Sequence, residues 1–160
     1  MHSSCLQTCL QSFNQQTNFC WIEIGCAHPT YGNNTKLLEE LGWEGVSVDI
    51  DPMVVENWKD RKTIPYSMNA LHIDWDKMPI WDLNDITDYL QIDVDPPQVS
   101  YEVLLNIPFH KHKFRVITFE HDHYADEHSN IREKSREYLK SRSEEHTSEL
   151  QSRETISYAV

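Results

Sequence analysis

The run Phe19-Cys-Trp-Ile-Glu-Ile-Gly25 decides the fold, because it is a short apolar stretch interrupted once, by Glu23, and ended by a glycine. A continuous run of this kind is typical of a parallel strand that is buried on both faces. Glycine at the strand end lets the backbone approach a ligand closely. We therefore place a central strand of a parallel sheet at residues 19–24.

Further strands and helices alternate after this first strand. Strands are expected at residues 45–49, 64–70, 88–94 and 114–119, and helices at residues 34–41, 52–61, 98–106 and 129–141. The first helix is capped by Asn33 or Asn34 and ended by Gly42, and the last is capped by Ser129. The positions expected to be apolar and inward are Leu37, Leu38, Leu41, Val99, Val103 and Leu104. This alternation predicts an α/β fold, with a mostly parallel sheet and helices on both faces.

The composition limits the classes of protein to which the chain can belong. Its 160 residues suffice for one domain, and no apolar run approaches the roughly 20 residues that cross a bilayer. A net charge of −12 repels phosphate backbones, so we expect neither a nucleic-acid nor a membrane partner. Residues 1–17 form a polar segment without the features of a secretory signal, which favours a cytoplasmic protein.

The 4 cysteines lie near the N-terminus, at Cys5, Cys9, Cys20 and Cys26. Cysteines gathered in one short stretch cannot cross-link a whole domain, so we expect reduced thiols. Their spacing is also a poor match to a zinc site.

The last residues differ in character from the rest of the chain. From Arg142 the sequence continues Arg-Ser-Glu-Glu-His-Thr-Ser-Glu-Leu-Gln-Ser, which resembles the translation of a common sequencing adapter. Arg153-Glu-Thr155 would stand at the adapter's variable index. The alternative is a polar helical tail capped by Ser143. We therefore expect an incomplete domain at residues 18–141, followed by a non-native tail at residues 142–160.

Polar residues follow the expected strands, at the edge where an open parallel sheet binds its ligands. The polar ones are Glu23, Asp49, Asn69, Asp93, Asp95, Glu120 and His121, and Gly25 and Ala70 stand beside them at the same strand ends. Gly25 lacks the other glycines of a GxGxxG turn, so no pyrophosphate site is predicted. Asp49 ends the second strand, where a carboxylate can accept hydrogen bonds from both ribose hydroxyls of an adenosine cofactor. These features favour S-adenosylmethionine, which carries positive charge and no phosphate, over NAD.

The same candidate residues have other interpretations. Glu23 could be a structural buried carboxylate, and residues 49–52 could be an ordinary aspartate-capped helix start. The aspartates at residues 93–95 could lie in a solvated loop, and His121 could be a surface histidine. A divalent cation is a further alternative, with Asp93, Asp95, Glu120 and His121 as its ligands. We favour a site without metal.

Motifs along residues 19–141 carry a resemblance to a known family. The first half contains Trp21-Ile-Glu-Ile-Gly-Cys-Ala-His28, Asn34-Thr35, Leu38-Glu-Glu-Leu-Gly-Trp-Glu-Gly45 and Val48-Asp-Ile-Asp-Pro52. The second half contains Asp88-Tyr-Leu-Gln-Ile-Asp-Val-Asp95, Val103-Leu-Leu-Asn-Ile-Pro-Phe109, Lys113-Phe-Arg-Val-Ile-Thr-Phe-Glu-His-Asp122 and Ser135-Arg-Glu-Tyr-Leu139. In combination these motifs resemble the FkbM-type methyltransferases, which use S-adenosyl-L-methionine.

The resemblance implies a Rossmann-like class I methyltransferase fold and assigns roles to the candidate residues. It implies that Glu23 and Gly25 lie near the methionine part of the cofactor, Asp49 at the ribose, and Asn69 and Ala70 near the adenine. Cys26, Asn34 and Ile50 complete the expected cofactor contacts. Asp93 and His121 are the candidate bases for methylation of a hydroxyl on a sugar or other small-molecule acceptor.

The sequence departs from the family in two places. Many members have Asp-Val-Glu-Gly-Ala where this chain has Asp93-Val-Asp-Pro-Pro97, and the antiparallel strand pair that completes the family's sheet is missing. Two other functions therefore stay open beside the methyltransferase. One is a dinucleotide-dependent oxidoreductase or epimerase, and the other is a non-catalytic truncated remnant.

Overall fold

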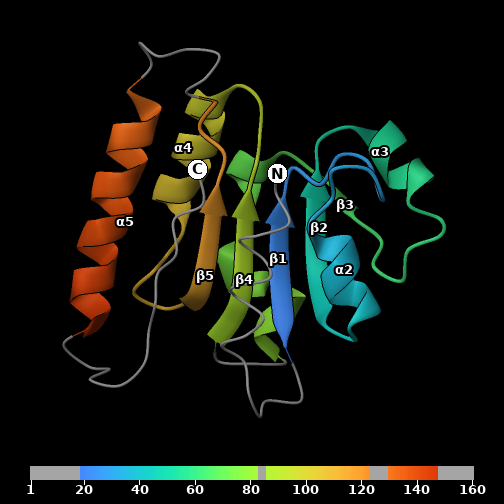
Figure 1. The fold of residues 1–160 in the computed structure, drawn as a ribbon, viewed down its shortest axis with the longest axis horizontal. Coiled ribbons are helices and arrows are strands. Elements are labelled where there is room, and N and C mark those ends of the chain that lie inside the picture. Colours follow the sequence, from blue (N-terminus) through green and yellow to red (C-terminus); the bar gives the residue numbers. More distant parts are fainter. Residues whose placement is uncertain (1–18, 83–85, 123–129, 148–160) are drawn as a thin grey trace.

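The computed structural model describes residues 19–82, 86–122 and 130–147 (Figure 1). The strands are β1 (Cys20–Ile24), β2 (Glu44–Asp49), β3 (Tyr66–Ser67), β4 (Ile86–Ile92) and β5 (Lys113–Phe119). The α-helices are α2 (Thr35–Glu40), α3 (Pro52–Asn57), α4 (Pro97–Asn106) and α5 (Ile131–Thr147). Short 3₁₀ helices η1 (Ala70–His72), η2 (Trp75–Lys77) and η3 (Pro79–Asp82) connect β3 to β4. Strands and helices therefore alternate, as predicted.

The strands form one parallel sheet in the order β3-β2-β1-β4-β5, with β1 at its centre. Ile22 is aligned with Val46 of β2 on one side and with Leu90 of β4 on the other. The chain fills the sheet outward from β1 to β3 and then crosses to β4 on the opposite side of β1. This reversal between β1 and β4 is where open α/β sheets bind ligands. The predicted α/β class is confirmed, and the fold is Rossmann-like.

The two faces of the sheet carry different cores because side chains alternate along each strand. On one face Ile22 and Leu90 pack in a large apolar cluster with residues of α4, α5 and the 3₁₀ helices. On the other face Trp21 packs in a smaller cluster with Leu38 of α2, Trp43, Tyr89 and Val116. Gly45 is needed on this second face, since a Cβ there would lie 2.1 Å from the Trp21 ring.

Several predicted boundaries are wrong. Helix α3 ends at Asn57 rather than at residue 61, β3 has 2 residues, and β4 covers residues 86–92 rather than 88–94. The 3₁₀ helices were not predicted, although they carry core residues such as Trp75 and Ile80. Turns of 3 or 4 residues are too short to display a helical period, which explains why the sequence pattern does not reveal them.

Helix α2 presents a different face to the sheet from the one predicted. Leu38 is buried, but Leu37 and Leu41 are 46% and 54% exposed. Thr35 and Glu39 are buried instead, because polar partners inside the fold bind them. In α4, by contrast, Val103 and Leu104 are fully buried as predicted, and Val99 packs against the same cluster.

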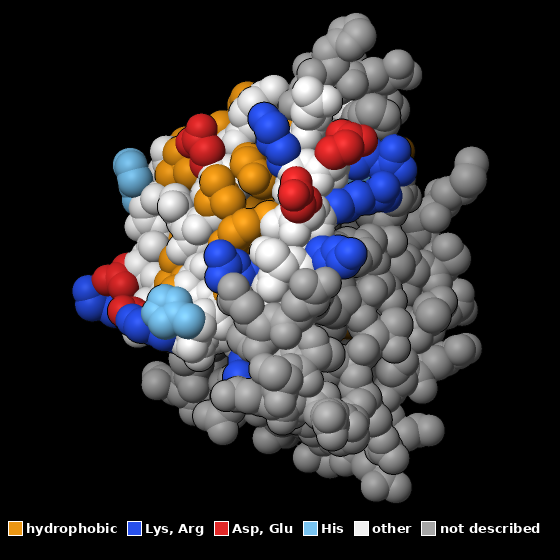
Figure 2. Space-filling model, turned by 90° about the vertical axis from the view of Figure 1, so that its left-hand side faces the viewer, with side chains coloured by type: hydrophobic (Ala, Val, Ile, Leu, Met, Phe, Trp, Pro, Cys, Tyr) orange, Lys and Arg blue, Asp and Glu red, His pale blue; other side chains and the backbone are white. Residues whose placement is uncertain are grey.

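Helix α5 lies at one end of the sheet, next to α4 (Figure 1). Charges of both signs are interspersed on the face of the molecule where it lies (Figure 2). The exposed charged residues of α5 include Glu133, Lys134, Glu137 and Lys140. The helix continues past Ser141 to Thr147, while its predicted cap, Ser129, lies outside the described residues. Among the residues described, no helix has the length and apolar character needed to cross a membrane.

Candidate functional site

The end of β1 is locked against the end of β4 at Gly25. Gly25 has a φ of +81°, and a Cβ at this position would lie 1.8 Å from the carbonyl oxygen of Asp93. Backbone hydrogen bonds join Gly25 N to Val48 O at 2.8 Å and Asp93 N to Ile24 O at 2.9 Å. Only glycine fits both the left-handed backbone and the close approach. Two of the predicted site residues, Gly25 and Asp93, therefore meet at the reversal point of the sheet.

Asp49 ties the β1–α2 loop, residues 25–34, to the end of β2. Its Oδ2 accepts a hydrogen bond from Ala27 N at 3.0 Å, and its Oδ1 accepts one from Asp51 N at 2.9 Å. Asp51, not Asp49, caps α3 by accepting from Met53 N at 2.8 Å. Ala27 has a φ of +45°, which is a strained conformation for a residue with a Cβ. Asp49 thus holds an unusual loop conformation and is itself held in one orientation.

Glu23 is fully buried and hydrogen-bonded on both carboxylate oxygens. Its Oε2 lies 2.8 Å from Thr35 Oγ1 and 2.8 Å from Ser47 Oγ, and its Oε1 accepts from Asn33 Nδ2 at 3.1 Å. Burial raises the pKa of Glu23 to about 7, although the bonds from Ser47 and Thr35 act in the opposite direction. The three partners are all uncharged side chains. Glu23 therefore holds the end of the β1–α2 loop through Asn33 and Thr35.

Three other predicted cofactor residues are distributed around this loop. The Cys26 thiol is buried, and burial raises its pKa, so it is not poised as a thiolate. Asn34 leaves α2 without a side-chain cap and donates instead to Gln91 Oε1 at 3.0 Å. Ile50 is 64% exposed beside Asp49 and offers an apolar surface.

The end of β3 brings Asn69 and Ala70 near Asp49. Met68 N donates to the carbonyl oxygen of Asp49 at 2.8 Å, so the chain leaving β3 runs beside the end of β2. Asn69 caps η1 by accepting from Leu71 N at 2.9 Å, and Ala70 packs against the large apolar cluster. These two residues therefore have a structural role, and a role near an adenine stays a prediction.

On the other side of the reversal point, the ends of β4 and β5 lie together. Glu120 N donates to Ile92 O at 2.9 Å, and the Asp93 side chain is exposed. Burial raises the pKa of Glu120, and the negative charges of Asp93 and Asp122 raise it further. His121 is 9% exposed, so it is not a surface histidine. Within the described ranges, no three His, Cys, Asp or Glu side chains are grouped closely enough to hold a metal ion.

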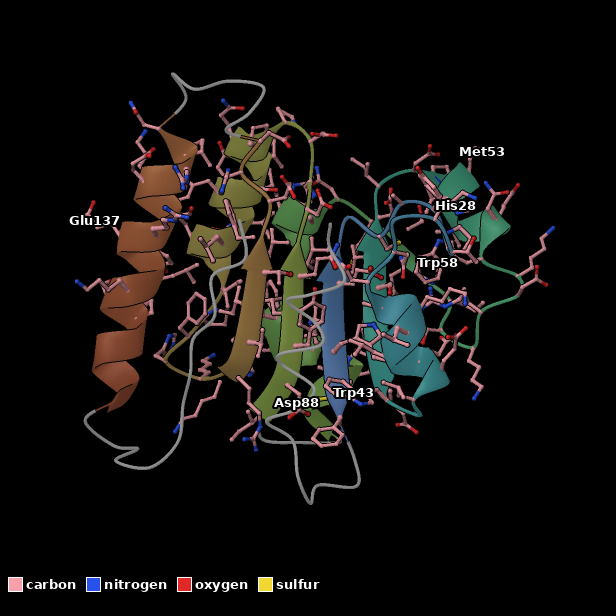
Figure 3. The ribbon with its side chains drawn as sticks, in the orientation of Figure 1. His28, Trp43, Met53, Trp58, Asp88 and Glu137 are labelled. Carbon is pink, nitrogen blue, oxygen red and sulfur yellow. The ribbon has the colours of Figure 1, made fainter. Side chains whose placement is uncertain are left out.

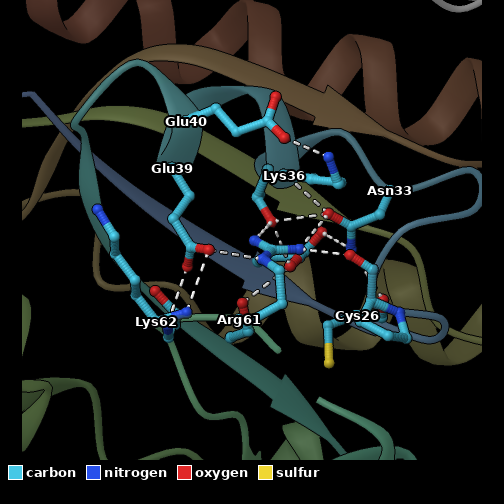
Figure 4. Close-up of polar contacts among 12 residues, drawn as sticks. Cys26, Asn33, Lys36, Glu39, Glu40, Arg61 and Lys62 are labelled. Carbon is cyan, nitrogen blue, oxygen red and sulfur yellow. Dashed lines mark hydrogen bonds and ion pairs between the residues drawn. The ribbon is translucent and has the colours of Figure 1, made fainter. Parts of the chain in front are cut away.

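Sequence reasoning missed the residues that surround this loop from α2 and α3. Arg61 reaches from the turn after α3 and contacts both Asn33 and Glu39 (Figure 4). Trp58 also lies at this edge of the sheet, near His28, whereas Asp88 and Trp43 lie at the opposite edge (Figure 3). One signal was present in the sequence for Ser47. It is a polar residue within a buried strand, and in the parallel register it is aligned with Glu23.

Comparisons with known proteins add no assignment to this geometry. Neither the protein-family models nor the curated protein sequences contain a match to the chain.

Proposed function

We propose that this chain binds S-adenosyl-L-methionine at the carboxyl edge of its sheet, as part of an FkbM-type methyltransferase domain. The observation that carries the proposal is the contact between Gly25 and Asp93 at the reversal between β1 and β4, with Asp49 at the end of the next strand. This is the place where open parallel sheets bind ligands, and the loop there is held in a defined conformation.

The charges around this edge support a cationic ligand without phosphate. Asp49 ends β2, and Asp93 and Glu120 come directly after β4 and β5; their carboxylates favour the ammonium and sulfonium groups of S-adenosylmethionine. A dinucleotide needs a helix that begins directly after the glycine turn, so that its free N–H groups face the pyrophosphate. Here α2 begins only at Thr35, and its Lys36 N already donates to Asn33 Oδ1 at 2.9 Å. The loop is therefore a poor phosphate site.

The two sides of the edge would hold different parts of the reactants. Each Asp49 oxygen accepts one backbone hydrogen bond, which leaves acceptor capacity for the ribose hydroxyls. Exposed Ile50 and the neighbouring Asn69 and Ala70 would bound the adenine. The enclosed Glu23 would act on the methionine part through the loop that it holds, because its own side chain has no exposed surface.

Asp93 and His121 would serve the methyl acceptor, a hydroxyl of a sugar or other small molecule. A bound S-adenosylmethionine would supply a methyl group on a positive sulfur, open to displacement by the hydroxyl oxygen, with neutral S-adenosylhomocysteine as the leaving group. Asp93 or His121 would take the hydroxyl proton. Much of the rate in such a displacement comes from alignment, so a rigid loop around the cofactor matters as much as the base.

Calorimetric titration of the 160-residue chain with S-adenosylhomocysteine tests the proposal. We expect binding that weakens about tenfold or more in Asp49→Asn, which loses one anionic acceptor for the ribose. The matched control is Asp51→Asn, which changes the exposed helix cap two residues away and should leave affinity unchanged. No binding tighter than about millimolar would overturn the proposal. Binding of NAD alone would favour the oxidoreductase or epimerase, and binding without methyl transfer would favour the non-catalytic remnant.

A further inference from the structure

Arg61 is buried beneath the β1–α2 loop, and its guanidinium group contacts the loop at two residues. Arg61 NH1 donates to Pro29 O at 2.7 Å and to Asn33 Oδ1 at 3.0 Å. Its NH2 donates to Thr35 Oγ1 at 3.2 Å, at the start of α2 (Figure 4). The side chain is 3% exposed, so these bonds are shielded from water. One side chain therefore spans both the middle and the end of the loop.

Glu39 fixes the orientation of this guanidinium group. Glu39 Oε1 lies 2.9 Å from Arg61 Nε, and the same carboxylate accepts from Lys62 N at 3.2 Å and from Thr63 N at 2.8 Å. Burial alone would raise the pKa of Glu39, but these hydrogen bonds lower it below its usual value, so the carboxylate stays charged. A charged pair in this place contributes little to stability beyond what an apolar pair of the same shape would. What the pair does provide is a defined direction for each of the other guanidinium donors.

The Asn33 side-chain amide connects Arg61 to Glu23 and Cys26. Its Oδ1 is surrounded by donors, Arg61 and Lys36 N, so its Nδ2 faces the acceptors Glu23 Oε1 and Cys26 O, both at 3.1 Å. The amide has no second orientation that satisfies all four contacts. Arg61 thereby determines how the loop is joined to the buried Glu23.

Trp58 adds a second connection from the same turn. Arg61 lies over the Trp58 ring, 4.4 Å from its centroid, and Trp58 Nε1 donates to Ala27 O at 2.9 Å. Ala27 is the residue with the strained positive φ, and Asp49 binds its N–H on the other side. Strain of this kind persists only where the surroundings hold it. The turn after α3 therefore holds the loop at Ala27, Pro29 and Asn33.

We propose that Arg61 is a positioning residue, which sets the conformation of residues 25–34 before any ligand arrives. Its side chain is 3% exposed and lies beneath the loop, so its effect on affinity would come through preorganisation. Lysine cannot replace it, because an ammonium group lacks the planar set of donors that reaches Glu39, Pro29, Asn33 and Thr35 together. The ligand part of this inference rests on the proposed function, whereas the loop conformation does not.

Amide hydrogen exchange of the unliganded chain tests the inference in Arg61→Gln and Arg61→Lys. We expect exchange in residues 25–34 to accelerate about tenfold or more in Arg61→Gln, with β1 and β4 unchanged, and to be restored only in part by Arg61→Lys. The control is Arg115→Gln, which breaks another ion pair with a buried carboxylate, 2.9 Å from Asp88 at the opposite edge of the sheet. It should leave exchange in residues 25–34 unchanged.

The affinity for S-adenosylhomocysteine is the second measurement. We expect it to fall about tenfold in Arg61→Gln, less in Arg61→Lys, and not at all in Arg115→Gln. A folded Arg61 variant whose loop exchanges as slowly as the original would overturn the inference, whatever it binds. If Arg61→Gln does not fold, Arg61→Lys decides, because it keeps the charge beside Glu39, and exchange and affinity equal to the original would overturn the inference. Faster loop exchange in a chain that binds no S-adenosylhomocysteine would leave the positioning role standing and remove only the proposed function.

Discussion

Glu23 and Asp88 are both buried carboxylates of central strands, but they lie at opposite edges of the sheet and hold different parts of the chain. Asp88 Oδ2 accepts from Cys20 N at 2.9 Å, and its Oδ1 lies 2.9 Å from Arg115 Nε, so one side chain links β1, β4 and β5. Glu23 binds the side chains of Ser47, Thr35 and Asn33, and two of these belong to the loop or to α2.

A buried carboxylate thus has two different roles in this molecule. At the amino edge the partners of Asp88 are strand residues whose positions the sheet already determines, so the pair stabilises the sheet. At the carboxyl edge two of the three partners of Glu23, Asn33 and Thr35, lie in or directly after a long connection that the sheet does not determine. There, hydrogen bonds from polar side chains fix the backbone conformation, whereas in the sheet backbone hydrogen bonds between strands fix it. Changes at the two edges should therefore affect global stability and loop order differently.

The largest loss of stability is expected from Gly25→Ala, which disrupts the contact between the ends of β1 and β4. The new Cβ would lie 1.8 Å from Asp93 O, so β1 and β4 must separate, and the φ of +81° adds strain. We expect a loss of at least about 3 kcal/mol in the free energy of unfolding, measured by urea denaturation. Gly42→Ala is the control, because its φ is +88° but nothing lies within 4 Å of its Cβ. It should cost only about 1 kcal/mol, and equal losses would refute the close contact.

Asp88→Ala is expected to have the next largest effect, on the sheet alone. It leaves Cys20 N and the Arg115 guanidinium without this partner inside the fold, and removal of one member of a buried pair typically costs about 3 kcal/mol. The ratio of the amide exchange rate in residues 25–34 to the rate in the strands should be the same in Asp88→Ala as in the original chain. If exchange accelerated more in this loop than in the strands, Asp88 would act on the carboxyl edge as well, and the contrast between the two edges would fail.

Glu23→Gln should change how stability depends on pH. The folded-state pKa is about 7 and the ordinary value is 4.5, so between them the folded chain binds more protons than the unfolded chain. Stability of the original chain should therefore fall as pH rises through this window, by about 2 to 3 kcal/mol in total. Glutamine does not titrate, so the difference between the two proteins should narrow or reverse from pH 5 to pH 8 in urea titrations. Parallel curves would show that Glu23 is not the titrating group.

Much of the fold could be predicted from the sequence because buried strands leave a clear pattern. The runs at β1, β4 and β5 are rich in aliphatic and aromatic residues and bounded by polar segments, and each was located to within about two residues. Helix α2 was located, but its inner face was predicted wrongly. Leu37 and Leu41 satisfied the helical period, whereas the inward residues Thr35 and Glu39 are polar. A hydrophobic pattern cannot reveal a helix face that is buried through hydrogen bonds.

The candidate site was predictable only where a residue follows a strand. Gly25, Asp49 and Asp93 could be placed at one edge because parallel strands end together there. Arg61 could not, since its position was assigned to the end of a helix and its partners are distant in sequence. Contacts between separate connections depend on the path of the whole chain, and no local pattern encodes them.

The smallest expected effect is that of Trp58→Phe, which tests whether the carboxyl edge differs from the amino edge in loop order. The change removes the hydrogen bond from Trp58 Nε1 to Ala27 O and keeps most of the ring, so it should cost about 1 kcal/mol. Trp43→Phe at the amino edge is the control, because Trp43 stacks on Phe19 at 4.7 Å, away from the loop. Only Trp58→Phe should accelerate amide exchange in residues 25–34. Equal acceleration in both would mean that the loop responds to global stability, and that the carboxyl edge has no positioning network of its own.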